Sequence, residues 1–209
     1  MKSNHFNWLK KPRGRVFVAC SGGVDSVALA LALRQTEEVT LAFFDHGNAL
    51  ARHEEAFIDD FARKYNFKVV KGRSDGVIPP GMSKEAFWRA ERYAWFKTLP
   101  GPVATGHTLD DAVEWYLFTC MHGEGRFMPH RHDNVVRPFL LTEKEKLIAF
   151  CERHDVTWFE DPTNQDADFA ARNHIRHKIL PEVMTINPGI FKVVKNKIAK
   201  KEQESAPIC

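Results

Sequence analysis

The sequence has few cysteines, and they are scattered along the chain. The four are Cys20, Cys120, Cys151 and Cys209, and no two of them form a Cys-x-x-Cys pair. Their spacing therefore gives no signature of a zinc site, an iron–sulfur cluster or a dithiol redox centre. Isolated thiols are typical of reducing compartments, where disulfides do not persist, so we expect a cytoplasmic protein.

Long apolar runs and a strong charge of one sign are also missing. No segment approaches the roughly 20 apolar residues that cross a bilayer, and residues 1–11 lack the apolar centre of a signal peptide. We therefore expect no membrane partner. The net charge is only +3, from 30 basic and 27 acidic side chains, which neither requires nor excludes a nucleic-acid partner.

The chain has the composition of a globular domain and alternates between two kinds of segment. Hydrophobic residues make up 44% of its 209 residues and charged residues 27%. Short β-branched runs predict strands at 15–20, 39–44, 67–71, 102–105 and 135–136. Helical segments are expected at 24–34, 50–65, 83–99, 109–121 and 142–154, and again over 168–201 with breaks at Pro181 and Pro188. This alternation predicts an α/β fold, with a doubly wound, mainly parallel sheet and helices on both faces.

A glycine-rich loop joins the first predicted strand to the first predicted helix. Its residues are Ser21, Gly22, Gly23, Val24, Asp25 and Ser26. Glycine permits a tight turn and close approach of a ligand to the backbone, and the amides of a helix N-terminus bind anions. The loop matches neither the Gly-x-x-x-x-Gly-Lys-Ser/Thr nor the Gly-x-Gly-x-x-Gly fingerprint. A structural Gly-Gly turn is the simpler explanation, but the added hydroxyls favour a site for the phosphates of ATP.

Polar residues also follow two later strands at the same edge of the predicted sheet, where open α/β sheets bind ligands. The group consists of Asp45, His46, Gly106, His107, Asp110, Asp111 and Glu114. One acid in a first helical turn would be explained by capping, but three acids on one side favour a site. Asp25 alone would repel a phosphate, so we expect Mg²⁺ between the two, held by Asp25 and Asp111.

Arginines supply the remaining candidates. Arg89 and Arg92 lie on neighbouring turns of the helix 83–99 and could bind a phosphate or a carboxylate. For Arg89, an i,i+4 pair with Glu85 on a solvated face is an equal alternative. Arg172 and Arg176 lie in a basic segment that would otherwise be a solvent-facing helix surface.

Taken together, these segments resemble the catalytic domain of the tRNA(Ile)-lysidine synthetases, which are N-type ATP pyrophosphatases of the PP-loop superfamily. The resemblance covers roughly residues 15–190. The loop at 21–26 indicates the superfamily, and the segments Trp158–Asn164 and Arg172–Arg176 narrow it to this family. This sequence departs from the family pattern at Thr108, Ala112 and Trp115, which stand where the family usually has His, Gln and Thr.

The resemblance implies an adenine nucleotide alpha hydrolase-like fold with a short helical C-terminal extension. Residues 1–140 would form the catalytic domain, 141–201 a basic helical extension that completes the site and contacts tRNA, and 202–209 a frayed tail. The implied substrates are ATP with Mg²⁺, free L-lysine and a tRNA(Ile) with a CAU anticodon, and a homodimer is a further expectation. The implied catalytic residues are Asp25, Arg89, Asp110, Asp111, Glu114, Arg172 and Arg176.

Three alternatives stay open at this stage. A 2-thiocytidine synthetase of the same superfamily would need paired cysteines, which the chain lacks. A tRNA-binding module without catalysis would not need the acids of the loop and the helix. A small-molecule amidoligase would lack the segment between Glu160 and Arg176 on which the family resemblance depends.

Overall fold

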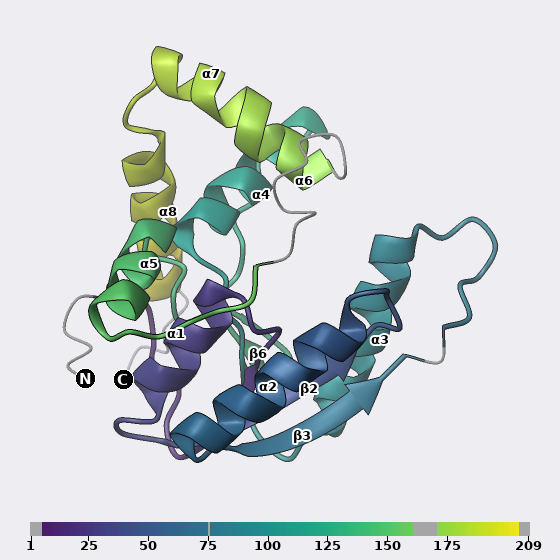
Figure 1. Ribbon diagram of the computed structural model, residues 1–209. Coiled ribbons are helices and arrows are strands. Elements are labelled where there is room, and N and C mark those ends of the chain that lie inside the picture. The colour runs from purple at the N-terminus through teal and green to yellow at the C-terminus, as the bar shows by residue number, and fades with distance from the viewer. Residues whose placement is uncertain (1–5, 75, 161–170, 205–209) are drawn as a thin grey trace.

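The computed structural model describes residues 6–74, 76–160 and 171–204 and contains a six-stranded, mainly parallel sheet (Figure 1). The strand order is β3-β2-β1-β4-β6-β5, and the β5–β6 pair is antiparallel while the other pairs are parallel. The strands are β1 (Arg15–Ala19), β2 (Glu38–Asp45), β3 (Lys68–Arg73), β4 (Val103–Ala104), β5 (Arg131–His132) and β6 (Val135–Val136). The predicted α/β fold class is thus confirmed.

Helices cover both faces of this sheet. The side chains of β1 alternate between the two faces and contact different helices on each. Val16 and Val18 pack in the core cluster that holds α1 (Val24–Leu33), α2 (Ala51–Tyr65) and α5 (Lys144–Arg153). Phe17 packs instead against α3 (Lys84–Thr98). Figure 1 shows α2 and α3 near the β3 side of the molecule.

A third cluster joins α4 (Leu109–Met121) to the C-terminal helices. Leu109 and Val113 of α4 are buried with Val194 and Ile198 of α8 (Ile190–Glu204), and Figure 1 shows the two helices close together. Between α5 and α8 in the chain lie α6 (Ala171–His174), a π-helical segment (Ile175–Ile179) and α7 (Leu180–Ile186). This cluster therefore fixes the C-terminal part of the chain against the helix that carries the predicted acids.

The structure differs from the sequence predictions at several boundaries. The short strand β5 was not predicted. Pro181 does not end a helix, because it is the second residue of α7 and lies in the first turn, where its missing N–H is tolerated. Helix α8 continues to Glu204, past the boundary expected at residue 201. The division into segments 1–140 and 141–201 stays a prediction.

Candidate active site

The loop after β1 places unused backbone amides at the start of α1. Gly23 is the N-cap of α1 and no side chain caps this helix end. Gly22 has a φ of +87°, and a Cβ there would lie 2.9 Å from Phe57 Cδ1, so only glycine fits this turn. The Ser26 hydroxyl donates to the Gly23 carbonyl at 2.9 Å. The loop is therefore built as an anion site whose free donors are mainly backbone N–H groups.

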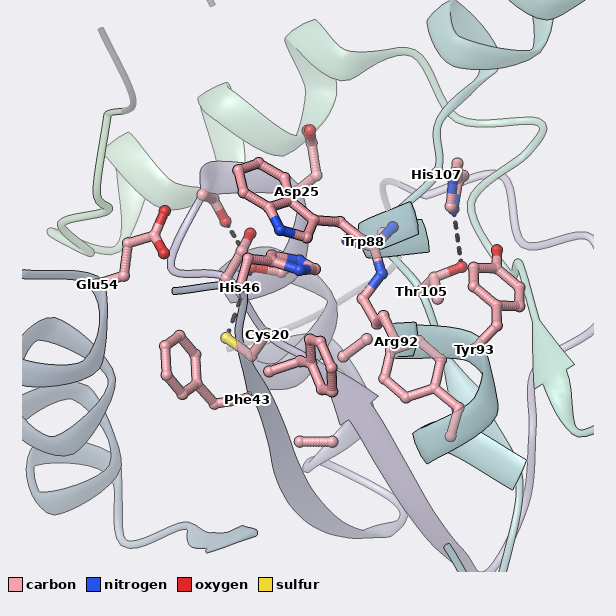
Figure 2. A pocket seen from close by; sticks show the side chains of 18 of the residues that line it. Cys20, Asp25, Phe43, His46, Glu54, Trp88, Arg92, Tyr93, Thr105 and His107 are labelled. Atoms are coloured by element: carbon pink, nitrogen blue, oxygen red, sulfur yellow. Dashed lines mark hydrogen bonds between the residues drawn. The ribbon is translucent and has the colours of Figure 1, made fainter. Parts of the chain in front are cut away.

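A cavity of about 410 Å³ opens beside this loop (Figure 2). Its volume lies within the range of small-molecule sites. It is lined by predicted site residues from the ends of β1 and β2 and from the segment leading into α4, namely Ser21, Gly23, Asp25, Ser26, His46, Gly106, His107 and Asp111. Gly22 and Val24 of the same loop are buried and do not line the cavity. Asp45 pairs with Arg73 at 3.3 Å and accepts from the Gly47 N–H at 2.6 Å.

Helix α3 supplies another wall of the cavity. Trp88 and Arg92 line it, with the Trp88 ring centroid 5.3 Å from that of His46 (Figure 2). Arg89, the predicted site residue, is exposed and lies over the Tyr93 ring at 4.8 Å. The structure therefore brings Arg92 to the cavity and turns Arg89 toward solvent.

His46 faces the cavity as a neutral imidazole. Burial, with a contribution from Arg92, lowers the pKa of His46 to about 4. Its Nδ1 is buried and accepts or donates no hydrogen bond within the described residues. A ligand atom in the cavity can therefore complete the hydrogen bonding of this ring.

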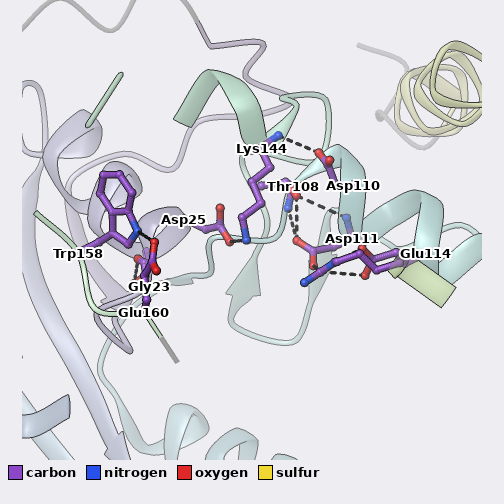
Figure 3. Close-up of polar contacts among 11 residues, drawn as sticks. Gly23, Asp25, Thr108, Asp110, Asp111, Glu114, Lys144, Trp158 and Glu160 are labelled. Atoms are coloured by element: carbon purple, nitrogen blue, oxygen red, sulfur yellow. Dashed lines mark hydrogen bonds and ion pairs between the residues drawn. The ribbon is translucent and has the colours of Figure 1, made fainter. Parts of the chain in front are cut away.

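Asp25 is the carboxylate nearest to the anion site, in the first turn of α1. Its Oδ2 lies 3.2 Å from Lys144 Nζ at the start of α5 (Figure 3), while its Oδ1 is buried without a partner among the residues the structure describes. Burial raises the pKa of Asp25 to about 6, although Lys144 opposes this shift. The carboxylate therefore has one unused oxygen and is poorly stabilised by the protein alone.

Gly106 holds the start of the acid helix segment close to Asp25. A Cβ at Gly106 would lie 2.8 Å from the Asp25 carbonyl carbon, so no larger residue fits without displacing the loop. The close approach brings His107 and Asp111 to the same cavity as Asp25. Burial lowers the pKa of His107 to about 3, and its Nδ1 shares a 2.8 Å hydrogen bond with Thr105 Oγ1.

The predicted acids of α4 have structural partners (Figure 3), and of the three only Asp111 lines the cavity, whereas Asp110 and Glu114 do not. Asp111 closes a capping box, in which its Oδ2 accepts from the Thr108 N–H at 2.8 Å. Burial would raise the pKa of Asp111, but neighbouring His107, Thr108 and Arg176 outweigh burial and lower it. Asp110 accepts from the Lys144 backbone N–H at 2.8 Å. Capping, the simpler explanation for these acids, is thus part of their role.

Glu114 and Arg176 form a bidentate ion pair across α4 and the π-helical segment. Arg176 donates from Nε to Glu114 Oε1 at 2.6 Å and from Nη2 to Oε2 at 3.0 Å, and its Nη2 lies 3.7 Å from Asp111 Oδ1. The Glu114 side chain is only 3% exposed. Burial raises the pKa of Glu114 and the ion pair opposes that shift, while Glu114 raises the pKa of Arg176 against burial.

Other predicted residues are placed less closely. Arg172 lies in α6, one turn before Arg176, and is not among the residues that line the cavity. The predicted segment 161–164 lies outside the described residues. Sequence reasoning did not select Lys144 or Trp88, and the only signal for Lys144 was its position at the start of a predicted helix.

Comparison with known proteins agrees with this loop and cavity. The PP-loop domain family matches residues 2–183, which is most of the chain. The chain belongs to the PP-loop domain family. Membership supports ATP as the nucleotide of this PP-loop domain.

Its relatives include proteins named tRNA(Ile)-lysidine synthase. The chain is 31% identical over 195 residues to the Persephonella marina protein, covering 84% of this chain and 43% of the relative. It is 33% identical to the Thermus thermophilus protein, with 81% and 36% covered, and 30% identical to the Vibrio parahaemolyticus protein, with 98% and 50% covered. The chain thus spans about half or less of the length of these relatives.

A solved structure shares the fold at low sequence identity. The NH3-dependent NAD synthetase from Campylobacter jejuni, in complex with the nitrate ion, superposes with a TM-score of 0.51 at 12% identity. The match covers 96% of this chain and 90% of that one. Within the described ranges, no helix of the PP-loop domain is long and apolar enough to cross a membrane.

Proposed function

We propose that this chain carries out ATP-dependent synthesis of lysidine on a tRNA(Ile) with a CAU anticodon. The observation that carries the proposal is the cavity shared by the phosphate loop and the acid helix, since Asp25 and Asp111 line it together. An adenylating enzyme needs a phosphate site and a nucleophile site next to each other. The relatives named tRNA(Ile)-lysidine synthase support this choice of substrates.

In the first step, O2 of the wobble cytidine attacks the α-phosphorus of ATP. A bond forms between O2 and phosphorus, the bond to the β-phosphate oxygen breaks, and pyrophosphate leaves. We assign phosphate binding to the amides after Gly23, at a helix end that no side chain caps, and to the Ser21 hydroxyl, which lines the cavity. Arg92 in the opposite wall adds a positive charge to the same cavity.

In the second step, the ε-amine of free lysine attacks C2 of the adenylated cytidine. A C2–N bond forms, the C2–O2 bond breaks, and AMP leaves with O2. The amine must lose a proton, and Asp111 is the proposed acceptor because it lines the cavity, whereas both oxygens of Glu114 accept from Arg176. Glu114 and Arg176 then keep Asp111 in a fixed electrostatic environment.

Mg²⁺ fits the site through Asp25. The buried Oδ1 of Asp25 has no hydrogen-bond partner in the described chain, and a hard cation prefers such an oxygen. Among the residues described, no three His, Cys, Asp or Glu side chains gather as a metal site, so nucleotide phosphates and water would complete the coordination. Asp25 would hold the ion, which would neutralise charge on the phosphates, and Asp111 would stay available as the proton acceptor.

The exposed lysines of the C-terminal helices are the proposed tRNA contacts. They are Lys178, Lys192, Lys197, Lys200 and Lys201. Their ammonium groups can pair with tRNA phosphates, which makes binding dependent on salt. A second subunit in a homodimer would extend this basic surface.

The test is a complete reaction with ATP, Mg²⁺, lysine and a CAU-anticodon tRNA transcript, followed by nuclease digestion and mass spectrometry of the nucleosides. We expect lysidine only when all four components are present. A transcript with uridine at the wobble position is the matched control and should stay unmodified. Pyrophosphate release that requires another nucleophile would indicate a different ligase, and no pyrophosphate release would indicate a binding module.

A further inference from the structure

Lys144 connects the two halves of the candidate site, although no sequence motif selected it. Its backbone N–H donates to Asp110 Oδ2 at 2.8 Å, and its Nζ lies 3.2 Å from Asp25 Oδ2 (Figure 3). The backbone is fixed because Leu147 and Phe150 of the same helix are fully buried in the core around α1. The Lys144 side chain keeps 35% of its surface exposed, so its ammonium group can move while the helix stays in place.

The ion pair between Lys144 and Asp25 is suited to exchange. Only one oxygen of Asp25 is used, and the other is buried without a partner in the part of the chain that the structure describes. The Lys144 and Asp25 side chains are 35% and 27% exposed and make a single contact, so solvent screens the pair and its contribution to stability is small. An incoming cation that uses both oxygens would therefore displace the ammonium group at little cost.

The other cations near the cavity are placed differently. Arg176 donates twice to Glu114, so its charge is already matched. Arg92 belongs to the wall formed by α3. The phosphate loop itself offers neutral amides and hydroxyls, whereas a nucleoside triphosphate brings several negative charges that need a cation. Lys144 is the cation that the structure holds against the first turn of α1, beside the loop.

We propose that Lys144 is a placeholder cation that neutralises Asp25 before nucleotide binds and then transfers its ammonium group to a phosphate oxygen of the nucleotide. Asp25 becomes available to a divalent cation in the same step. This inference rests on the proposed ATP site. It makes Lys144 a phosphate-binding residue of the reaction, contributed by a helix far from the loop in the sequence.

The first experiment measures binding of ATP, pyrophosphate and adenosine by calorimetry in EDTA, where no metal can act through Asp25. Lys144→Ala should weaken ATP and pyrophosphate binding by about 10-fold or more, because a hydrogen bond to a charged group is lost. Adenosine binding should change less than about 2-fold, since adenosine has no phosphate. Arg153→Ala removes a positive charge from the exposed far end of the same helix and should behave like wild type.

The second experiment tests the exchange itself. Asp25→Asn releases the ammonium group and should tighten pyrophosphate binding in EDTA by about 3-fold or more, through loss of a repelling charge and of a competing partner. Adding Lys144→Ala to Asp25→Asn should remove this gain. Lys144→Arg keeps the charge and should retain most of the affinity, and thermal unfolding of each variant separates lost binding from lost fold.

The outcomes separate this inference from the proposed function. Equal ATP affinity of Lys144→Ala and wild type, or an equal loss for adenosine, would overturn the inference alone. Absence of ATP binding in wild type would overturn both. A third outcome is that wild type forms no lysidine at any lysine concentration while Lys144→Ala still binds pyrophosphate more weakly than wild type does. That result would overturn the proposed function and leave the inference standing.

Discussion

At the acid helix the buried charges are matched within the protein, whereas at the phosphate loop a carboxylate keeps an unused oxygen. Glu114 is 3% exposed, and both its oxygens accept hydrogen bonds from Arg176. Asp25 has one contact, from Lys144, and a buried Oδ1 that has no partner in the described residues. The pKa values follow this contrast only at Asp111, whose neighbours lower its pKa, because burial raises the pKa of Glu114 as well as that of Asp25, which reaches about 6.

The difference indicates that folding alone satisfies the buried carboxylate of Glu114, whereas Asp25 needs a ligand to satisfy its second oxygen. A bidentate buried ion pair fixes geometry before substrate arrives. A desolvated carboxylate with a raised pKa destabilises the folded state at neutral pH, and such groups gather at functional sites. We therefore expect a substitution in the Glu114–Arg176 pair to lower stability. A substitution of Asp25 should lower activity and raise stability.

The largest effect is expected for Asp25→Asn on the adenylation step. The amide keeps the shape of the side chain but cannot hold a divalent cation, so several kcal/mol of charge neutralisation are lost. Pyrophosphate release should fall on the order of 10³-fold. Removal of Mg²⁺ with EDTA should reduce wild type to a similar level and have little further effect on the variant.

Asp60→Asn is the matched control for this substitution. Asp60 lies on α2, where its exposed carboxylate pairs with Arg63. The same chemical change there should alter pyrophosphate release by less than about 2-fold, because exposed pairs contribute little. Full activity of Asp25→Asn would contradict the assignment of the unused oxygen to a metal.

A second effect, on stability, is expected at the acid helix. Arg176→Met removes the partner of Glu114 and leaves its carboxylate buried, which should lower the free energy of unfolding by about 3 kcal/mol at pH 7. Urea denaturation measures this loss. Arg126→Met, at an exposed arginine that pairs with Glu124, is the control and should stay within about 0.5 kcal/mol of wild type. An unchanged midpoint for Arg176→Met would show that the pair contributes nothing.

The parts of this site that the sequence predicted depend on local geometry. Gly22 needs a positive φ directly after a strand, and an acid such as Asp111 in a first helical turn is explained by capping, so both are visible in a short window. The same holds for the strand–helix alternation behind the fold. The resemblance added the order of the motifs along the chain.

The parts that the sequence did not predict depend on tertiary packing. Lys144 reaches Asp25 only because α5 packs beside α1, and no local pattern reports that contact. Arg89 and Arg92 lie on neighbouring turns of one amphipathic helix, and the sequence alone did not reveal which of them faces a cavity. The unpredicted strand β5 consists of Arg131 and His132, which lack the β-branched side chains that predicted the equally short β6.

A third prediction follows from the raised pKa of Asp25. Because the folded pKa is about 6 and the ordinary value is 3.8, folding binds protons between these values, and stability from this group falls as pH rises from about 4 to 6. Asp25→Asn does not titrate, so its stability relative to wild type should grow over that window by about 2 kcal/mol and stay level above it. Urea midpoints of both proteins from pH 4 to 8 measure the difference; a constant difference would contradict the raised pKa.

The smallest effect is expected from the two arginines of α3, which extend the comparison to the other wall of the cavity. Arg92 lines the cavity and Arg89 is exposed over Tyr93, although they differ by one turn of the same helix. Arg92→Ala should weaken binding of ATP or of the adenylated substrate by about 10-fold, since it removes a charged hydrogen-bond donor. Arg89→Ala should change it by less than about 2-fold, because its charge faces solvent. Equal losses in the two variants would show that the positive potential of the whole helix matters, and a larger loss for Arg89→Ala would assign the contact to the residue that the sequence favoured.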